Sequence, residues 1–259
     1  MKILRSIAEL DTALAPLRAS SSLALVPTMG ALHEGHAALF RAARAECDAV
    51  VASIFVNPTQ FTKRADLDAY PGNFEQDTAL AESERVDLLF APTAPEMYPA
   101  GFATWVEPRG AADGLEGAHR PGHFRGVATV CVKLFNLVRP GRAYFGRKDA
   151  QQVAVIKQIV RDLNLAIEIR VVPTLRASDG LALSSRNAGL TPEERERALA
   201  IPRALATRDP ASARAILAEA GIQPDYVALA DLDGPTFAIA ARIGSTRLID
   251  NVLLEGAPR

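Results

Sequence analysis

The stretch LALVPTMGALHEGH, residues 23–36, contains the signals that decide the fold. Residues 23–26 form a short apolar run closed by Pro27, which is typical of a buried strand. A turn containing glycine follows, and a helical pattern then continues to about Cys47. A strand, a glycine turn and a helix start in this order predict a phosphate site, because backbone N–H groups and the helix dipole favour an anion there.

Two residue types in this stretch, glycine and histidine, strengthen the interpretation as a phosphate site. Gly30 and Gly35 allow the backbone to approach a ligand closely, and His33 and His36 can point at the same anion. A zinc protease is disfavoured, since its His-Glu-x-x-His motif places the second histidine one residue later than it occurs here. A plain turn with two exposed histidines remains the alternative for this segment alone.

Strand and helix patterns alternate through the first two thirds of the chain. Further strands are predicted at 49–56, 87–90, 143–145 and 167–172, with helices at 73–85, 127–138 and 153–163. The helix at 73–85 reads as a surface helix. Such alternation predicts an α/β fold, in which helices cover both faces of a parallel sheet and ligands bind at the carboxyl ends of the strands.

The pattern changes after about Leu175. Thr191-Pro192 begins a helix that runs towards Ala206, and Pro202 predicts a kink or break inside it. A second helix is predicted at 211–220, followed by strands at 225–230, 237–243 and 247–254. We therefore expect two domains, residues 1–174 and a small α+β domain at 175–259.

Composition bounds the class of protein. The chain has 259 residues, 29 basic against 30 acidic, and a formal net charge of −1, which gives no support to nucleic-acid binding. No apolar run approaches the roughly 20 residues of a membrane span, and the acidic, helix-patterned N-terminus is unlike a secretory signal. A cytoplasmic protein is expected, with Cys47 and Cys131 as buried free thiols.

Other polar segments also follow predicted strands. Asn57 and Gln60 are uncharged hydrogen-bonding groups suited to hydroxyls and a carboxylate, although Asn-Pro alone indicates only a turn. Lys148, in GRKDAQQ at 146–152, can neutralise phosphate charge, and Asp149 can cap the helix, hold a metal or bind an amine. The spacing is not that of a Walker motif, and a charged helix start is the alternative.

Two further segments complete the set. Ser184, Ser185 and Arg186 suit a polyphosphate, and a polar linker is the alternative. RPGHFRG at 120–126 precedes the helix predicted at 127–138, where it either adds a basic gate or caps that helix.

The six stretches taken together resemble the pantothenate synthetase family in order and approximate spacing. They are PTMGALHEGH (27–36), FVNPTQF (55–61), RPGHFRGVATV (120–130), GRKDAQQ (146–152), LALSSRN (181–187) and ARIGSTRLIDN (241–251). The resemblance covers nearly the whole chain. The chain departs from the family pattern by being shorter around 207–212 and by having Arg147 where Glu or Gln is usual.

This resemblance implies a Rossmann-like nucleotidyltransferase domain, a C-terminal lid and a homodimer. It implies a ligase of pantothenate and coenzyme A biosynthesis that condenses D-pantoate with β-alanine, using ATP with Mg²⁺. The pantoate carboxylate would attack the α-phosphorus to give pantoyl adenylate and pyrophosphate, and β-alanine would then displace AMP. Because no protein nucleophile is required, catalysis would rest on positioning and charge stabilisation.

Site residues are implied by the same resemblance. His36 and Lys148 take the catalytic positions, Gln60 and Gln152 bind pantoate, and Gln60 also lies near the β-alanine amine. An imidazole such as His36 can be cationic beside a triphosphate. No metal site built from protein ligands is implied. The residues that would contact ATP are Met29, Gly30, Ala31, Leu32, His33, Glu34, Gly35, His36, Gly146, Arg147, Lys148, Asp149, Leu175, Leu183, Ser184, Ser185 and Arg186.

Two other functions remain open at this point. A related nucleotidyltransferase acting on a phosphorylated small molecule would also use an H-x-x-H turn, and a nucleotide-binding regulator would keep the fold without turnover. For Arg147 we expect a side chain that points to solvent or to a partner subunit, rather than one that joins the phosphate cluster.

Overall fold

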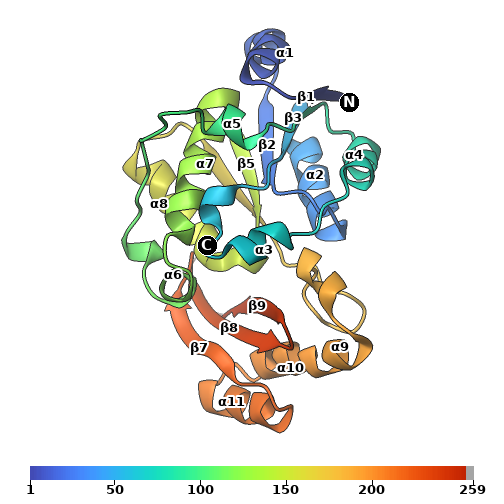
Figure 1. The fold of residues 1–259 in the computed structure, drawn as a ribbon, viewed down its shortest axis with the longest axis vertical. Coiled ribbons are helices and arrows are strands. Elements are labelled where there is room, and N and C mark those ends of the chain that lie inside the picture. The colour runs from blue at the N-terminus through green and yellow to red at the C-terminus, as the bar shows by residue number, and fades with distance from the viewer. Residues whose placement is uncertain (255–259) are drawn as a thin grey trace. The chain divides into compact units, whose positions relative to one another are not determined.

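The computed structural model describes residues 1–254, which form two compact units (Figure 1). The first unit comprises Met1–Gly146 and Val155–Val172. The second comprises Arg147–Ala154 and the chain from Pro173 onward. The single domain boundary expected at residue 174 stays a prediction; by its contacts, the segment Arg147–Ala154 groups with the C-terminal unit.

A six-stranded parallel sheet forms the centre of the first unit, in the order β1-β4-β3-β2-β5-β6. The α/β fold predicted from the alternating pattern is therefore confirmed. The strands are β1 (Lys2–Leu4), β2 (Leu23–Thr28), β3 (Ala49–Ile54), β4 (Leu88–Phe90), β5 (Arg142–Gly146) and β6 (Glu168–Val172).

Helices connect these strands and cover both faces of the sheet, with α2 and α4 on one side and α7 on the other (Figure 1). The helices up to β6 are α1 (Ile7–Ser20), α2 (Glu34–Glu46), α3 (Arg64–Asp68), α4 (Phe74–Ser83), α5 (Ala94–Met97), α6 (Leu115–His119), α7 (His123–Val138) and α8 (Ala150–Asp162). Three 3-10 turns lie among them: η1 (Pro58–Gln60), η2 (Gly110–Ala112) and η3 (Arg147–Asp149).

The predicted strand at 23–26 is two residues longer in the structure, because β2 continues through Pro27 to Thr28. Pro27 cannot donate a backbone hydrogen bond, which normally excludes proline from a central strand. The pairing between β2 and β5 extends only to Leu25, so Pro27 lies beyond it and pairs with Ser53 of β3 alone. The proline therefore marks the carboxyl end of the strand, where the phosphate loop was predicted.

The N-terminus combines a short strand with the helix that the sequence pattern predicts. The predicted helical spacing is confirmed for α1, whose start is closed by a capping box between Ser6 and Glu9. Residues Lys2–Leu4 form β1 instead, paired with β4 at the edge of the sheet. A three-residue strand is too short to show a period of two, which is why the pattern did not reveal it.

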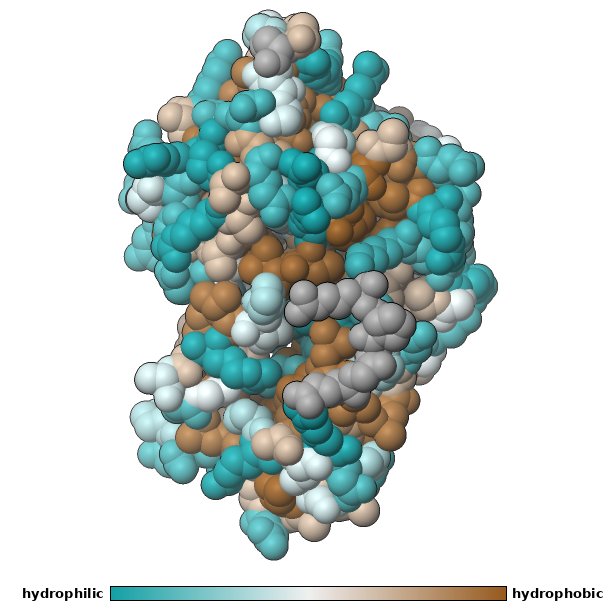
Figure 2. Space-filling model, turned by 180° about the vertical axis from the view of Figure 1, so that it is seen from behind, coloured by the Kyte–Doolittle hydropathy of each residue, from teal (hydrophilic) through white to brown (hydrophobic). Residues whose placement is uncertain are grey.

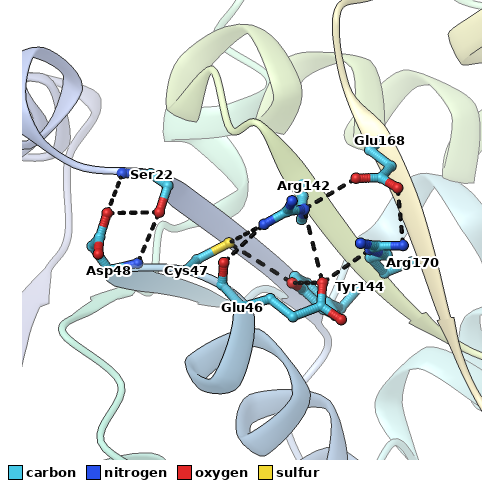
Figure 3. Close-up of polar contacts among 8 residues, drawn as sticks. All are labelled: Ser22, Glu46, Cys47, Asp48, Arg142, Tyr144, Glu168 and Arg170. Atoms are coloured by element: carbon cyan, nitrogen blue, oxygen red, sulfur yellow. Dashed lines mark hydrogen bonds and ion pairs between the residues drawn. The ribbon is translucent and has the colours of Figure 1, made fainter.

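A polar network joins α2, β5 and β6 at the amino ends of the strands (Figure 3). Arg142 and Glu168 are register partners whose side chains pair at 3.0 Å, and Arg170 contacts Glu46 at 2.9 Å. The Tyr144 hydroxyl donates to Glu46, and burial raises the pKa of Tyr144. Ligands of parallel sheets bind at the opposite, carboxyl ends, so this network ties the strands together and lies away from the predicted site.

The second unit contains a three-stranded antiparallel sheet in the order β7-β8-β9. Its strands are β7 (Pro224–Asp231), β8 (Pro235–Ile243) and β9 (Thr246–Leu253), and its helices are α9 (Pro192–Ala198), α10 (Ala200–Ala206) and α11 (Pro210–Glu219), preceded by the turn η4 (Ser185–Gly189). Buried apolar residues of β8 and α10, among them Phe237, Ile239 and Ile201, form its core. The small α+β unit predicted from the tail is confirmed.

The break predicted at Pro202 is present. The helix that begins with the capping box of Thr191 and Glu194 ends at Ala198, and a new helix starts at Ala200. Pro202 lies in the first turn of the new helix, where its missing N–H costs little. The next connection, from Ala206 to Pro210, is short.

Cys47 and Cys131 are buried free thiols, as predicted, and burial raises the pKa of Cys131 to about 12. Within residues 1–254, no helix combines the length and the apolar character that crossing a membrane requires. Figure 2 shows hydrophilic side chains over much of the visible face, with apolar residues between them.

Candidate active site

The loop between β2 and α2 carries the first group of predicted site residues. Gly30 and Ala31 both adopt positive φ, +82° and +51°, and so turn the chain sharply after the strand. A Cβ atom at Gly30 would lie 2.8 Å from the Asp77 carboxylate, so glycine is required there by contact as well as by conformation.

A buried carboxylate fixes this loop. Asp77 of α4 is 3% exposed and accepts hydrogen bonds from the backbone N–H groups of Ala31, at 2.9 Å, and Leu32, at 2.6 Å. These two amides, counted among the expected phosphate donors, are thus already engaged by protein. Asp77 was missed because α4 reads as a surface helix; a buried acid within it gives no periodic signal.

The two histidines of the loop form the start of α2. The Nδ1 atom of His33 accepts from the Gly35 amide at 3.0 Å, and Nδ1 of His36 accepts from the His33 amide at 3.2 Å. Because a backbone N–H can only donate, both Nδ1 atoms are acceptors, and the proton of each neutral ring is on Nε2. A cationic His36, as expected beside a triphosphate, would have to give up this cap.

Gln60 lies in the turn η1, which follows β3, and is 7% exposed. Its Nε2 lies 3.0 Å from the sulfur of Met29, and its Oε1 accepts from Asn57 at 3.0 Å. The register pairs Thr28 with Ile54, so both loops leave the same edge of the sheet. The structure therefore brings the predicted pantoate residue Gln60 against the predicted ATP loop.

The RPGHFRG stretch supports the backbone at Gln60. His123, the first residue of α7, contacts the Gln60 carbonyl oxygen through Nδ1 at 2.9 Å and is 6% exposed. A Cβ at Gly126 would lie 2.5 Å from the Thr59 carbonyl oxygen, so only glycine lets α7 approach η1 this closely. Of the two roles left open for this stretch, the contacts favour helix start and support.

The second group of predicted residues lies in the C-terminal unit. Lys148 is in η3, with its Nζ 3.8 Å from Asp149 Oδ1, and Gln152 is half-buried on α8. The Ser184 hydroxyl accepts from the Arg186 amide at 3.3 Å and caps η4. Lys148 and Ser184 line one cavity of about 10 Å³, so the structure brings these two predicted phosphate residues together.

The remaining predicted contacts of this unit come from a short antiparallel turn. The Leu183 amide donates to the Leu175 carbonyl oxygen at 2.9 Å, which holds these two predicted ATP contacts side by side. The turn is extended by the bridge between Arg176 and Ala182.

The expected exposure of Arg147 is wrong. Its side chain is 9% exposed, and its guanidinium donates to Thr236 Oγ1 at 2.7 Å and to the Asp233 carbonyl oxygen at 3.2 Å. Burial lowers the pKa of Arg147, and the Asp233 carboxylate acts against that shift. A charge is buried only where partners exist, and here the β7–β8 turn supplies them, far along the chain and invisible to local pattern.

These observations define an α/β protein with a six-stranded parallel sheet, a loop with two histidines at the carboxyl end of that sheet, and a small C-terminal unit with an antiparallel sheet. The sequence model of the family "Pantoate-beta-alanine ligase" matches residues 2–253. The chain belongs to this family.

Individual relatives agree with the family match. The pantothenate synthetase of Rhizorhabdus wittichii is 52% identical, with all of both chains covered over 282 aligned positions, so it carries residues that this 259-residue chain lacks. The crystal structure of pantothenate synthetase from Thermus thermophilus is 45% identical, with a TM-score of 0.89 over 97% of this chain and 99% of that one. A Francisella tularensis pantoate-beta-alanine ligase, complexed with beta-gamma ATP and beta-alanine, is 39% identical, with a TM-score of 0.91 over all of both chains.

Proposed function

We propose that this protein joins pantoate to β-alanine at the expense of ATP, through a pantoyl-adenylate intermediate. The observation that supports the proposal is the 3.0 Å contact of Gln60 with Met29. Through it, the amide that we assign to the pantoate carboxylate lies beside the loop that we assign to ATP. The Francisella ligase, which was crystallised with an ATP compound and β-alanine, supports these substrates.

In the first step, a pantoate carboxylate oxygen forms a bond to the α-phosphorus, and the bond from that phosphorus to the bridging oxygen breaks to release pyrophosphate. Negative charge grows on the leaving group. Lys148 and the Nε2–H of His36 are the groups we assign to that charge. Gln60 and Gln152 hold the pantoate, and Ser184, Ser185 and Arg186 hold the phosphates.

In the second step, the β-alanine amine attacks the acyl carbon, AMP leaves, and the amine loses a proton. We place the amine near Gln60. Pre-positioning of two reactants can supply most of the acceleration, so this chemistry requires no protein nucleophile.

Mg²⁺ fits this proposal as part of the nucleotide substrate. Within residues 1–254, no group of three or more His, Cys, Asp or Glu side chains is placed to hold a metal ion. Mg²⁺ in ATP sites usually keeps several waters and is bound through phosphates with one or two carboxylates. The homodimer and the cytoplasmic location implied by the family resemblance stay predictions.

Exchange of labelled pyrophosphate into ATP tests the intermediate. We expect exchange that requires pantoate and proceeds without β-alanine, because the first step is complete before the amine is needed. Exchange with other carboxylic acids but not with pantoate would refute the substrate. A folded protein that binds ATP and supports no exchange with any acid would be a regulator, and activity only on a phosphorylated acceptor would indicate the related transferase.

Gln60→Ala tests the assignment of Gln60 to pantoate and not to ATP. We expect the KM for pantoate to rise about 10- to 100-fold, since a hydrogen bond to a charged ligand is worth about 1.5–3 kcal/mol. ATP affinity, measured by calorimetry, should change less than about threefold.

Gln158→Ala is the matched control, because the Gln158 amide also uses both its nitrogen and its oxygen in hydrogen bonds, here with the backbone of Arg109 and Ala111, but belongs to no proposed binding position. An equal loss of ATP and pantoate affinity in Gln60→Ala would contradict the assignment.

A further inference from the structure

Asn251, near the end of β9, holds the backbone of the turn that carries Lys148. Its Nδ2 donates to the carbonyl oxygens of Arg147, at 3.1 Å, and Lys148, at 2.9 Å. These carbonyls belong to consecutive residues of η3. One side-chain amide therefore holds the backbone of the turn at Lys148 itself. Asn251 is 5% exposed, and solvent does not compete for these bonds.

The strand that bears Asn251 is itself fixed. Asn251 pairs with Ala238 of β8, in the centre of the three-stranded sheet. Its neighbour Asp250 forms a two-pronged contact with Arg176, at 2.6 and 3.1 Å. Asp250 Oδ1 also accepts a hydrogen bond from the backbone N–H of Asn251 at 2.8 Å. The grip on η3 is therefore anchored in the rigid part of the unit.

Arg147 holds the same turn from a second direction. Its guanidinium donates to Thr236, whose hydroxyl donates onward to the Gly234 carbonyl oxygen at 2.8 Å. Arg147, through its side chain, and Asn251, through two backbone carbonyls, thus both tie this turn to the C-terminal sheet.

The Asn251 side chain is only partly satisfied by hydrogen bonds. Its Oδ1 is buried and makes no hydrogen bond among the described residues. An unsatisfied buried acceptor costs about 1–3 kcal/mol, and in native proteins such an atom calls for an explanation. The two hydrogen bonds that Nδ2 donates to η3 are the contribution that requires a side-chain amide at position 251.

We propose that Asn251 is a positioning residue for adenylation, which aims the Lys148 ammonium by fixing its backbone. The proposal rests on the proposed role of Lys148 at the phosphates. Lysine reaches its target through a flexible four-carbon stem, so its aim depends on where the stem begins. A misplacement of about 1 Å can cost about 100-fold in rate.

The test compares Asn251→Ala and Asn251→Asp in the two half-reactions. We expect kcat for pantoate-dependent pyrophosphate exchange to fall about 10- to 100-fold in both variants, with the KM for pantoate changed less than about threefold. Aspartate keeps the size but loses the donors, so wild-type exchange in Asn251→Asp would overturn the proposal. Pantothenate formation from supplied pantoyl adenylate and β-alanine should stay within about twofold, and an equal loss there would indicate general damage.

A double-mutant cycle with Lys148→Ala separates this proposal from the proposed function. In the Lys148→Ala background, Asn251→Ala should lower exchange by less than about twofold further, because residues that act as a unit are not additive. An undiminished effect in that background would overturn the positioning role. Wild-type exchange in Lys148→Ala alone would instead remove Lys148 from the site.

Two additional variants guard against misfolding. Arg197→Ala loses hydrogen bonds to two successive carbonyls, of Ala220 and Gly221, in the same unit, and should leave exchange unchanged. If Asn251→Ala fails to fold, Asn251→Leu removes both donors at nearly constant volume. A fall of about 10-fold or more in exchange kcat in Asn251→Leu supports the proposal, and unchanged exchange contradicts it.

Discussion

Lys148→Ala is expected to lower the rate of pantoate adenylation about 10²- to 10³-fold, with little change in the stability of the fold. The physical reason is that the ammonium meets charge that appears only as pyrophosphate leaves. Removing one such group typically costs two to three orders of magnitude in kcat. Single-turnover formation of AMP-linked product measures the step directly, and thermal unfolding of the same variant measures stability.

The lysine control for this experiment is present on the same helix–turn segment. Lys157 lies on α8 and belongs to no proposed binding position, so Lys157→Ala should adenylate at the wild-type rate. Lys148→Arg is expected to recover little of the lost activity, since a planar guanidinium does not replace a compact ammonium at a fitted site. Adenylation at the wild-type rate in Lys148→Ala would remove this residue from the mechanism.

His36→Ala is expected to reduce adenylation by a similar factor, about 10²- to 10³-fold. The hydrogen bond at the His36 ring indicates which of its two nitrogens can act. Nδ1 of His36 accepts from the His33 amide, so Nε2–H is the ring donor that we assign to the phosphates. The alanine also removes a helix cap, and a loss of about 0.5–2 kcal/mol in the free energy of unfolding should accompany the loss of activity.

His36→Gln separates the two effects. Glutamine at this third position of a helix can reach back to the N-cap amide and restore the capping box. We expect near-normal unfolding but a rate close to that of His36→Ala. If His36→Gln were as active as the wild type, the cap would be the whole contribution of His36. His119→Ala, a change of an exposed histidine outside the proposed site, should be silent in both measurements.

The sheet and the main helices could be predicted because their signals are local. The apolar run at Ala49–Ile54 and the spacing of Val127, Cys131 and Leu134 depend only on neighbouring residues. The turn carrying His33 and His36 was likewise visible, since a strand, a glycine and a helix start follow one another within a few positions. Glycine turns at strand ends are strong local signals.

The supports of the site could not be predicted, because they join distant parts of the chain. Asp77 accepts hydrogen bonds from backbone amides 45 and 46 positions earlier in the chain. Asn251 donates to backbone carbonyls 103 and 104 positions earlier. The prediction that the Arg147 side chain is exposed was wrong for the same reason. Its partners lie 86 and 89 positions later, and a general preference of arginine for the surface decided the prediction in their absence.

The sequence distance between Lys148 and Asn251 also has a consequence for synthesis of the protein. A ribosome that has just made Lys148 must add 103 more residues before Asn251 exists, which takes roughly 5–20 s at ordinary rates of synthesis. Until then the turn lacks its anchor on β9. A nascent chain can therefore fold much of its parallel sheet while the turn that carries Lys148 still lacks this support, and we expect full adenylation activity only after β9 has been made.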